Sequence, residues 1–161
     1  MKDSKKVVIR VYALIFDEMG RLLVADESHQ GIPMTKFPGG GLEWGEGILD
    51  CLRRECLEEL GQAPNTLEHF YTTEFFQPSI FSPDHQVVSV YYRAVMGDPG
   101  AIHAIESSNV IDSSAGDTLT LRWLPGDEIS SDALTLPIDK YVAAMLCRLR
   151  GSGDDSSRKE E

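Results

Sequence analysis

The stretch Gly40–Gly61, GGLEWGEGILDCLRRECLEELG, places glycines, carboxylates and an arginine at fixed intervals. Its second half is typical of a helix that ends at a glycine. On such a helix, residues three and four positions apart share a face, so Glu55, Glu58 and Glu59 can converge on one small volume. Three carboxylates there repel one another unless a cation binds. Oxygen ligands suit Mg²⁺ or Mn²⁺, and Mg²⁺ commonly keeps positions for water and phosphate oxygens.

An ordinary amphipathic surface helix in an acidic protein is the alternative interpretation of this segment. In that case the charged residues are solvated and an apolar stripe faces the core. That stripe would consist of Ile48, Leu49, Leu52, Cys56 and Leu60. A plain surface helix, however, requires neither the triple glycine at positions 39–41 nor the proline before it. The spacing therefore favours a metal site.

The segment Gly40–Gln62 resembles the Nudix box, the signature of the Nudix hydrolase family. That signature is a glycine, five residues, a glutamate, seven residues, Arg-Glu, an aliphatic residue, any residue, Glu-Glu, any residue, a glycine and an aliphatic residue. Every glycine and charged position is matched. Two aliphatic positions differ, because Cys56 is only a small hydrophobe and Gln62 is polar.

The resemblance implies an α/β/α sandwich, with a mixed β-sheet between the motif helix and a C-terminal helix. It also implies an enzyme that hydrolyses a pyrophosphate linkage with Mg²⁺ or Mn²⁺, since cleavage needs neutralised phosphate oxygens and a positioned water. Matched position by position, the metal ligands would be Glu55, Glu58, Glu59 and the backbone carbonyl of Gly40.

Two further box residues, Glu46 and Arg54, complete the catalytic set implied by the resemblance. They would pair and brace the glycine turn against the helix, where the helix dipole favours a carboxylate near the N-terminus. A solvated helix charge is the alternative for Arg54. The general base stays open between Glu55 and a loop carboxylate. The loop candidates are Asp84, Glu106, Asp112 and Asp117.

Residues outside the box offer candidates for substrate binding. Lys36 precedes the Phe-Pro-Gly turn and is placed to reach a phosphate oxygen, although a plain surface lysine is the alternative. Phe76 and Phe81 could stack on a nucleobase or fill the core. Asp117 is the fourth candidate. The run 76–82, FQPSIFS, partly resembles the substrate-linked regions of ADP-ribose and NADH hydrolases in the family.

These features favour a substrate in which a nucleoside diphosphate is linked to another moiety, such as ADP-ribose or a dinucleotide. One alternative is a nucleoside triphosphate pyrophosphohydrolase, including one that acts on oxidised nucleotides. A ligand-sensing Nudix domain without turnover is another. The complete set of box carboxylates argues against the sensing domain.

Length and composition limit the other possibilities. A chain of 161 residues fits one domain, which we assign to residues 1–150, and the polar segment 151–161 is predicted to be a disordered tail. A net charge of −11 argues against nucleic acid as a partner. Three cysteines without a pairing pattern, no signal segment and no long apolar run indicate a cytoplasmic protein that does not enter a membrane. A homodimer stays open.

Hydrophobic patterns predict the elements around the box. Residues 6–16 and 22–25 are expected to form a hairpin, residues 27–37 a loop, and residues 47–60 the motif helix. Further strands are expected near 69–76, 87–96 and 118–123. A core-facing helix should begin at Pro137, because proline suits the first turn of a helix.

Overall fold

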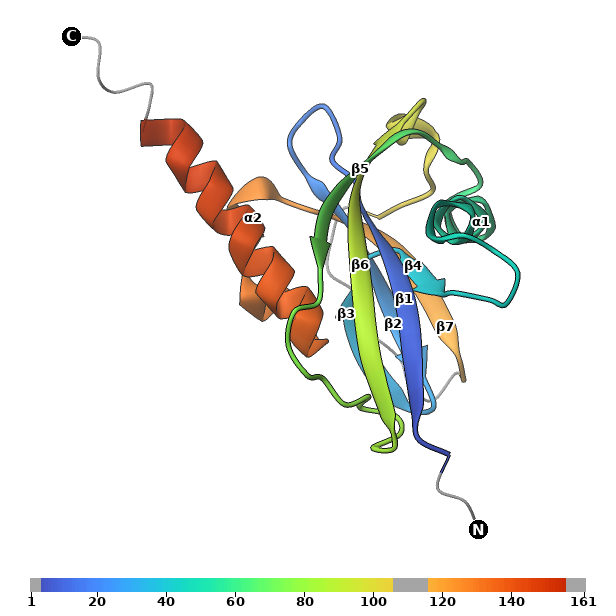
Figure 1. The fold of residues 1–161 in the computed structure, drawn as a ribbon. Helices are drawn as coiled ribbons and strands as arrows, with labels where there is room; N and C mark the ends of the chain where they lie inside the picture. The colour runs from blue at the N-terminus through green and yellow to red at the C-terminus, as the bar shows by residue number, and fades with distance from the viewer. Residues whose placement is uncertain (1–3, 106–115, 156–161) are drawn as a thin grey trace, which may run out of the picture.

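The computed structural model describes residues 4–105 and 116–155 of the chain, and side chains are described up to Ser152. In this part of the chain, four strands precede the first α-helix and three more lie between it and the second (Figure 1). In chain order they are β1 (Lys6–Leu14), β2 (Leu22–His29), β3 (Ile32–Lys36), β4 (Gly39–Gly41), α1 (Ile48–Leu60), β5 (Pro64–Thr72), β6 (His85–Met96), β7 (Thr118–Leu124) and α2 (Pro137–Asp155). Short 3₁₀ turns occupy Pro99–Ala101, Gly126–Glu128 and Ser131–Ala133.

The described strands form two sheets that lie between α1 and α2 (Figure 1). One sheet has the order β4-β1-β6-β5 and is mixed, because β1 runs parallel to β6 and antiparallel to β4. The other has the order β3-β2-β7 and is antiparallel. The predicted α/β/α sandwich is therefore confirmed, with its strands divided between two sheets.

Alternation along β1 divides the core between the two helices. Successive side chains of a strand point to opposite faces. Val11 and Ala13 pack in a cluster with the buried face of α1, whereas Tyr12 and Leu14 pack in a second cluster with α2. Both helices are thus fixed relative to the same strand.

Helix α1 has the predicted bounds within one residue. It begins after Gly47, whose N–H donates to the Asp50 carboxylate over 3.0 Å. It ends at Gly61, where φ is 76°, a left-handed conformation that glycine adopts without a steric penalty. Gln62 then exchanges two hydrogen bonds with the backbone of Asp98, so the polar departure from the box signature anchors the end of the helix.

Two predictions about the N-terminal strands are wrong. β1 and β2 meet only near their turn, through the bridge Phe16–Leu22, because both edges of β1 are taken by β4 and β6. The predicted loop 27–37 instead contains the end of β2 and all of β3. Gln30 and Gly31 turn the chain with φ of 51° and 75°, a two-residue hairpin turn that its polar neighbours concealed.

The later elements differ from the predictions mainly in their bounds. β5 begins at Pro64 and ends at Thr72, earlier than the predicted strand 69–76. α2 begins at Pro137 as predicted and continues to Asp155. Residues 151–155 of the predicted tail are therefore helical, and the Ser152 hydroxyl donates to the Arg148 carbonyl over 2.9 Å. The remaining residues of that tail, 156–161, lie outside the described part of the chain.

Within the described residues, no helix combines the length and the apolar character that crossing a membrane requires.

Candidate active site

Two carboxylates of α1 face the short strand β4. The Gly39 N–H donates to Glu59 Oε2 over 3.3 Å. A Cβ on Gly40 would lie 2.2 Å from Glu55 Oε1, so only glycine leaves room for that carboxylate. Gly39 is equally constrained, because its φ is 144° and a Cβ would lie 2.1 Å from the carbonyl oxygen of Val11. The glycines therefore bring the backbone of β4 against Glu55 and Glu59.

Arg54 ties the loop before α1 to the helix. Its guanidinium donates to both carboxylate oxygens of Glu46, over 2.7 and 3.0 Å, and to the Gly41 carbonyl over 3.1 Å. It also donates to Glu55 Oε1 over 3.0 Å. The hydrogen bonds from Arg54 lower the pKa of Glu46 to about 2. These contacts join the loop before α1 to the helix, and the bracing role that the family resemblance implies stays a prediction.

The third carboxylate, Glu58, lies apart from the other two. Its side chain is 59% exposed and lies 3.4 Å from the Arg54 guanidinium. Across residues 4–105 and 116–155, no three His, Cys, Asp or Glu side chains gather closely enough to hold a metal ion. The convergence expected from helical spacing is therefore not found in this structure. Protein cations relieve the repulsion between these carboxylates instead. Arg54 forms ion pairs with Glu55 and Glu58, and Lys36 forms one with Glu59.

Lys36 is a buried cation, only 3% exposed, and not the plain surface lysine of the alternative interpretation. Its ammonium donates to the Gly39 carbonyl over 3.2 Å and lies 3.5 Å from Glu27 and 4.0 Å from Glu59. Burial alone would lower the pKa of Lys36, but the surrounding negative groups, Glu59 first, raise it above its ordinary value. Lys36 therefore stays charged.

Burial raises the pKa of Glu59 to about 6. Lys36 opposes this rise, and the negative charge of Glu55 adds to it. A largely buried carboxylate beside another carboxylate is an arrangement whose repulsion a hard divalent cation would relieve. The donor set of Glu55, Glu59 and the Gly40 backbone, with Glu58 at the exposed side, fits such a cation in its chemistry.

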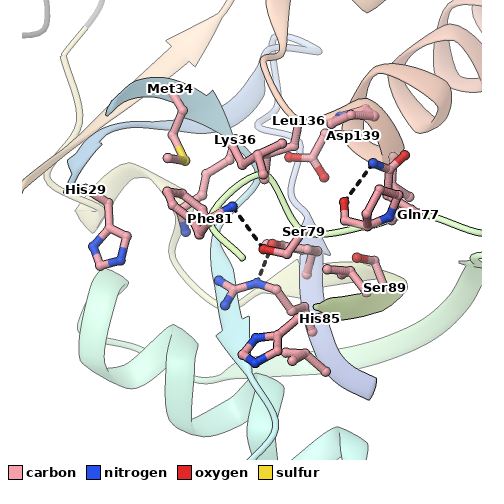
Figure 2. Close-up of a pocket in the computed structure, with 18 of the residues that line it drawn as sticks. His29, Met34, Lys36, Gln77, Ser79, Phe81, His85, Ser89, Leu136 and Asp139 are labelled. Carbon is pink, nitrogen blue, oxygen red and sulfur yellow. Dashed lines mark hydrogen bonds between the residues drawn. The ribbon is translucent and has the colours of Figure 1, made fainter. Parts of the chain in front are cut away.

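Figure 2 shows a cavity of the protein, whose volume is about 330 Å³ and which shares Lys36 with this cluster. Such a volume suits the nucleoside part of a ligand. Its polar lining includes Arg10, Glu27, Lys36 and Asp139, and much of its apolar lining comes from the segment 77–81. Lys36 thus belongs both to the cavity and to the carboxylate cluster.

The structure places the four predicted substrate-binding residues differently. Lys36 and Phe81 line the cavity (Figure 2). Phe76 is 71% exposed and is not among the lining residues. Asp117 contacts the turn between β2 and β3, where its carboxylate lies 3.2 Å from His29 Nδ1 and accepts from the Gln30 N–H over 3.1 Å. Asp117 therefore touches a residue of the cavity rim without lining the cavity itself.

Of the other carboxylates considered as general base, Asp84 is exposed in the turn before β6 and does not line the cavity. Glu106 and Asp112 lie outside the described residues. Glu55 is the candidate that lies against β4. The identity of the base stays a prediction.

Sequence reasoning missed Asp139, which is fully buried at the start of α2 and lines the cavity. Its carboxylate accepts from the Tyr91 hydroxyl over 2.5 Å and from the Phe37 N–H over 3.4 Å. Burial raises the pKa of Asp139 to about 6. The available signal was its spacing, because Val142, Ala143 and Leu146 follow at three, four and seven positions and place the carboxylate on the apolar face.

Arg10 and Tyr12 were also missed, since both belong to a strand that was identified only by its apolar content. They alternate with Val11 along β1 and both line the cavity. A polar residue at every second position of a buried strand was the signal that could have indicated a lined site.

Comparison with known proteins supports one family. A family model described as the NUDIX domain matches residues 6–145. The E. coli ORF135 protein matches over 98% of this chain and 97% of its own, with 19% identity and a TM-score of 0.62. The MutT protein from Methanosarcina mazei Go1 matches over 91% and 97%, with 18% identity and a TM-score of 0.61.

A third solved structure is the NUDIX domain of Shewanella oneidensis NrtR complexed with ADP ribose. It matches over 91% of this chain and 88% of its own, with 16% identity and a TM-score of 0.57. At these identities, the three structures establish a shared fold.

Proposed function

The chain belongs to the Nudix family, and we propose that it is a Mg²⁺-dependent pyrophosphohydrolase whose substrate is a nucleoside diphosphate linked to another moiety. The observation that carries the proposal is the position of Lys36. This side chain lines the cavity and lies 4.0 Å from Glu59 of the carboxylate cluster. A nucleotide in the cavity would therefore present its diphosphate to the cluster.

Each box residue has a role in this proposal. Glu55, Glu58, Glu59 and the Gly40 carbonyl hold the cation, with Mn²⁺ as a substitute for Mg²⁺. When bound, the cation neutralises phosphate oxygens and lowers the pKa of a bound water. Arg54 and Glu46 fix the orientation of Glu55 through the hydrogen bonds described above. Lys36 supplies positive charge beside the phosphate.

The segment 77–81 supports the choice of substrate class. All five of its residues line the cavity: Gln77, Pro78, Ser79, Ile80 and Phe81. This is the run whose sequence partly resembles the substrate-linked regions of ADP-ribose and NADH hydrolases. Its position beside the cavity is consistent with contact to a group linked to the diphosphate.

The test is a panel of nucleotides that includes ADP-ribose, NADH and nucleoside triphosphates, incubated with and without Mg²⁺. Chromatography identifies the products. We expect Mg²⁺-dependent release of a nucleoside monophosphate and a phosphorylated second moiety. Release of inorganic pyrophosphate from a triphosphate would support the triphosphate hydrolase instead. Tight binding without turnover would support a sensing domain.

A further inference from the structure

Arg10 projects from β1 into the cavity and is held there by Tyr12. Its Nε donates to the Tyr12 hydroxyl over 2.7 Å, and its guanidinium carbon lies 5.6 Å from the centre of the Tyr12 ring. Tyr12 is itself 1% exposed and stacks on Tyr91 with ring centroids 5.3 Å apart. The orientation of the Arg10 guanidinium is therefore fixed by a rigid buried neighbour.

The two terminal amino groups of Arg10 have spare donors. Among residues 4–105 and 116–155, the contact with Tyr12 is the hydrogen bond found for this side chain, and no carboxylate lies within 4.0 Å of its nitrogens. Other arginines near the site differ. Arg54 donates to three glutamates, and Arg122 makes a paired contact with Asp26. Their donors are used within the protein.

The position of Arg10 joins the cavity to the carboxylate cluster. In the pairing of β1 with β4, Arg10 lies opposite Gly41. A Cβ on Gly41 would lie 3.8 Å from Arg10 Nη1, so the terminal amino groups of Arg10 lie beside β4. Tyr12 first, and the charges of Glu27 and Glu55 after it, raise the pKa of Arg10 above its ordinary value, so the guanidinium stays protonated. An anion bound there would be next to the proposed metal ligands.

A guanidinium offers its N–H groups in a planar fork that matches two oxygens of a phosphate. We infer that Arg10 binds the diphosphate of the substrate through its two terminal amino groups, on the side of the phosphate that faces the cavity. This inference rests on the proposed function and adds a substrate-binding residue that lies outside the Nudix box. Tyr12 is the positioning residue that orients the fork.

The test uses inorganic pyrophosphate and ¹⁵N-labelled protein in EDTA, so that no metal contributes to binding. The signals of the arginine Nε–H groups are followed by NMR, and the Arg10 signal is assigned by its loss in Arg10→Gln. We expect pyrophosphate to shift the Arg10 signal in a saturable way. Arg10→Gln should weaken pyrophosphate binding about tenfold or more, and Arg10→Lys should lie between it and the wild type.

Arg93→Gln is the matched control, because this substitution removes the same charge as Arg10→Gln. Arg93 is exposed on β6 and does not line the cavity. The substitution should leave pyrophosphate binding within about twofold of the wild type, since exposed charges act weakly at a distance. Equal losses in Arg10→Gln and Arg93→Gln would overturn the inference, because only net charge would then matter. Absence of pyrophosphate binding by the wild-type protein would overturn it as well.

Failure of the proposed function gives a different result. Glu59→Gln should abolish hydrolysis in Mg²⁺ but leave pyrophosphate binding in EDTA intact, because it removes a negative charge and none of the Arg10 donors. A protein that binds pyrophosphate through Arg10 but hydrolyses no nucleotide would contradict the proposed enzyme and support the phosphate site.

Discussion

Arg54 donates two hydrogen bonds to the carboxylate of Glu46, over 2.7 Å from Nη2 to Oε1 and over 3.0 Å from Nε to Oε2. The two residues lie eight positions apart along the chain, and the pair closes the loop between β4 and α1. Because the same guanidinium also contacts Glu55, the pair links the shape of the loop to a proposed metal ligand.

The pair should make stability depend on pH in the acid range. The pKa of Glu46 is about 2 in the folded protein, below its ordinary value of 4.5. The stabilising effect is therefore present above about pH 4.5 and is lost as the pH falls towards 2. Urea unfolding of the wild type and Glu46→Gln should differ near neutral pH and converge in acid. The exposed Glu128→Gln serves as control, and a difference that persists at the lowest pH would contradict the assignment.

Asp139 should make the stability of the protein depend on pH in the opposite direction. Burial raises its pKa from 3.8 to about 6, so the folded state favours the protonated form. Its contribution to stability is complete below about pH 3.8 and is lost as the pH rises through 6, a change of about 3 kcal/mol. Asp139→Asn should remove this decline in the free energy of unfolding, whereas the exposed Asp132→Asn should retain it. The same pH profile in Asp139→Asn and the wild type would rule out this role.

Two of the three glycines of β4, Gly39 and Gly40, should respond differently to an added methyl group. In Gly40→Ala the nearest atoms to the new Cβ belong to the Glu55 carboxylate, a flexible side-chain end, so we expect a folded protein with weakened metal-dependent activity. In Gly39→Ala it meets the backbone of Val11 at an unfavourable φ, so the free energy of unfolding should fall by about 1–3 kcal/mol or more. Thermal unfolding and activity assays separate the two outcomes. Gly100→Ala, whose new Cβ would make only an ordinary contact 3.6 Å from Asp98 Oδ1, should change neither.

Much of the fold was predictable because local signals and tertiary packing agree. Glycines at both ends of α1 and the proline at the start of α2 specify helix termini by their own conformational preferences, and the structure has both. β3 escaped detection because Pro33 and polar neighbours disguise a short strand whose pairing is set by the turn at Gln30. The strands that pair with β1 lie far from it in the sequence, so local patterns cannot predict the pairing.

Spacing along a helix predicts which carboxylates of the candidate site share a face, but it does not predict which cations neutralise them. It correctly put Glu55 and Glu59 on one side, facing β4. It could not show that Lys36 and Arg54 would neutralise the carboxylates separately, because those contacts depend on how β3 and the loop before α1 fold back. Asp139 and Arg10 were missed for a similar reason, since the cavity is assembled from four separate segments of the chain.

Two phenylalanines of the segment after β5 differ in position, because one lines the cavity and the other lies on the surface. Phe81 lines the cavity and contacts the His29 ring with centroids 5.2 Å apart, whereas Phe76 is largely exposed. Phe81→Ala should raise KM several-fold with little change in kcat, because an aromatic contact to the ligand is lost. Phe76→Ala should leave both constants unchanged. Equal effects of the two substitutions would show that the ligand does not enter this cavity.

The central claim is that the carboxylates of α1 carry metal-dependent cleavage of a pyrophosphate linkage. The most direct measurement compares the hydrolysis rates of the wild type, Glu59→Gln and the exposed control Glu68→Gln on the best substrate, across a titration of Mg²⁺. We expect Glu59→Gln to lower kcat by about two orders of magnitude or more, because metal stabilisation of the transition state is worth several kcal/mol. Glu68→Gln should match the wild type. An unchanged rate in Glu59→Gln, or a wild-type rate independent of Mg²⁺, would contradict the claim.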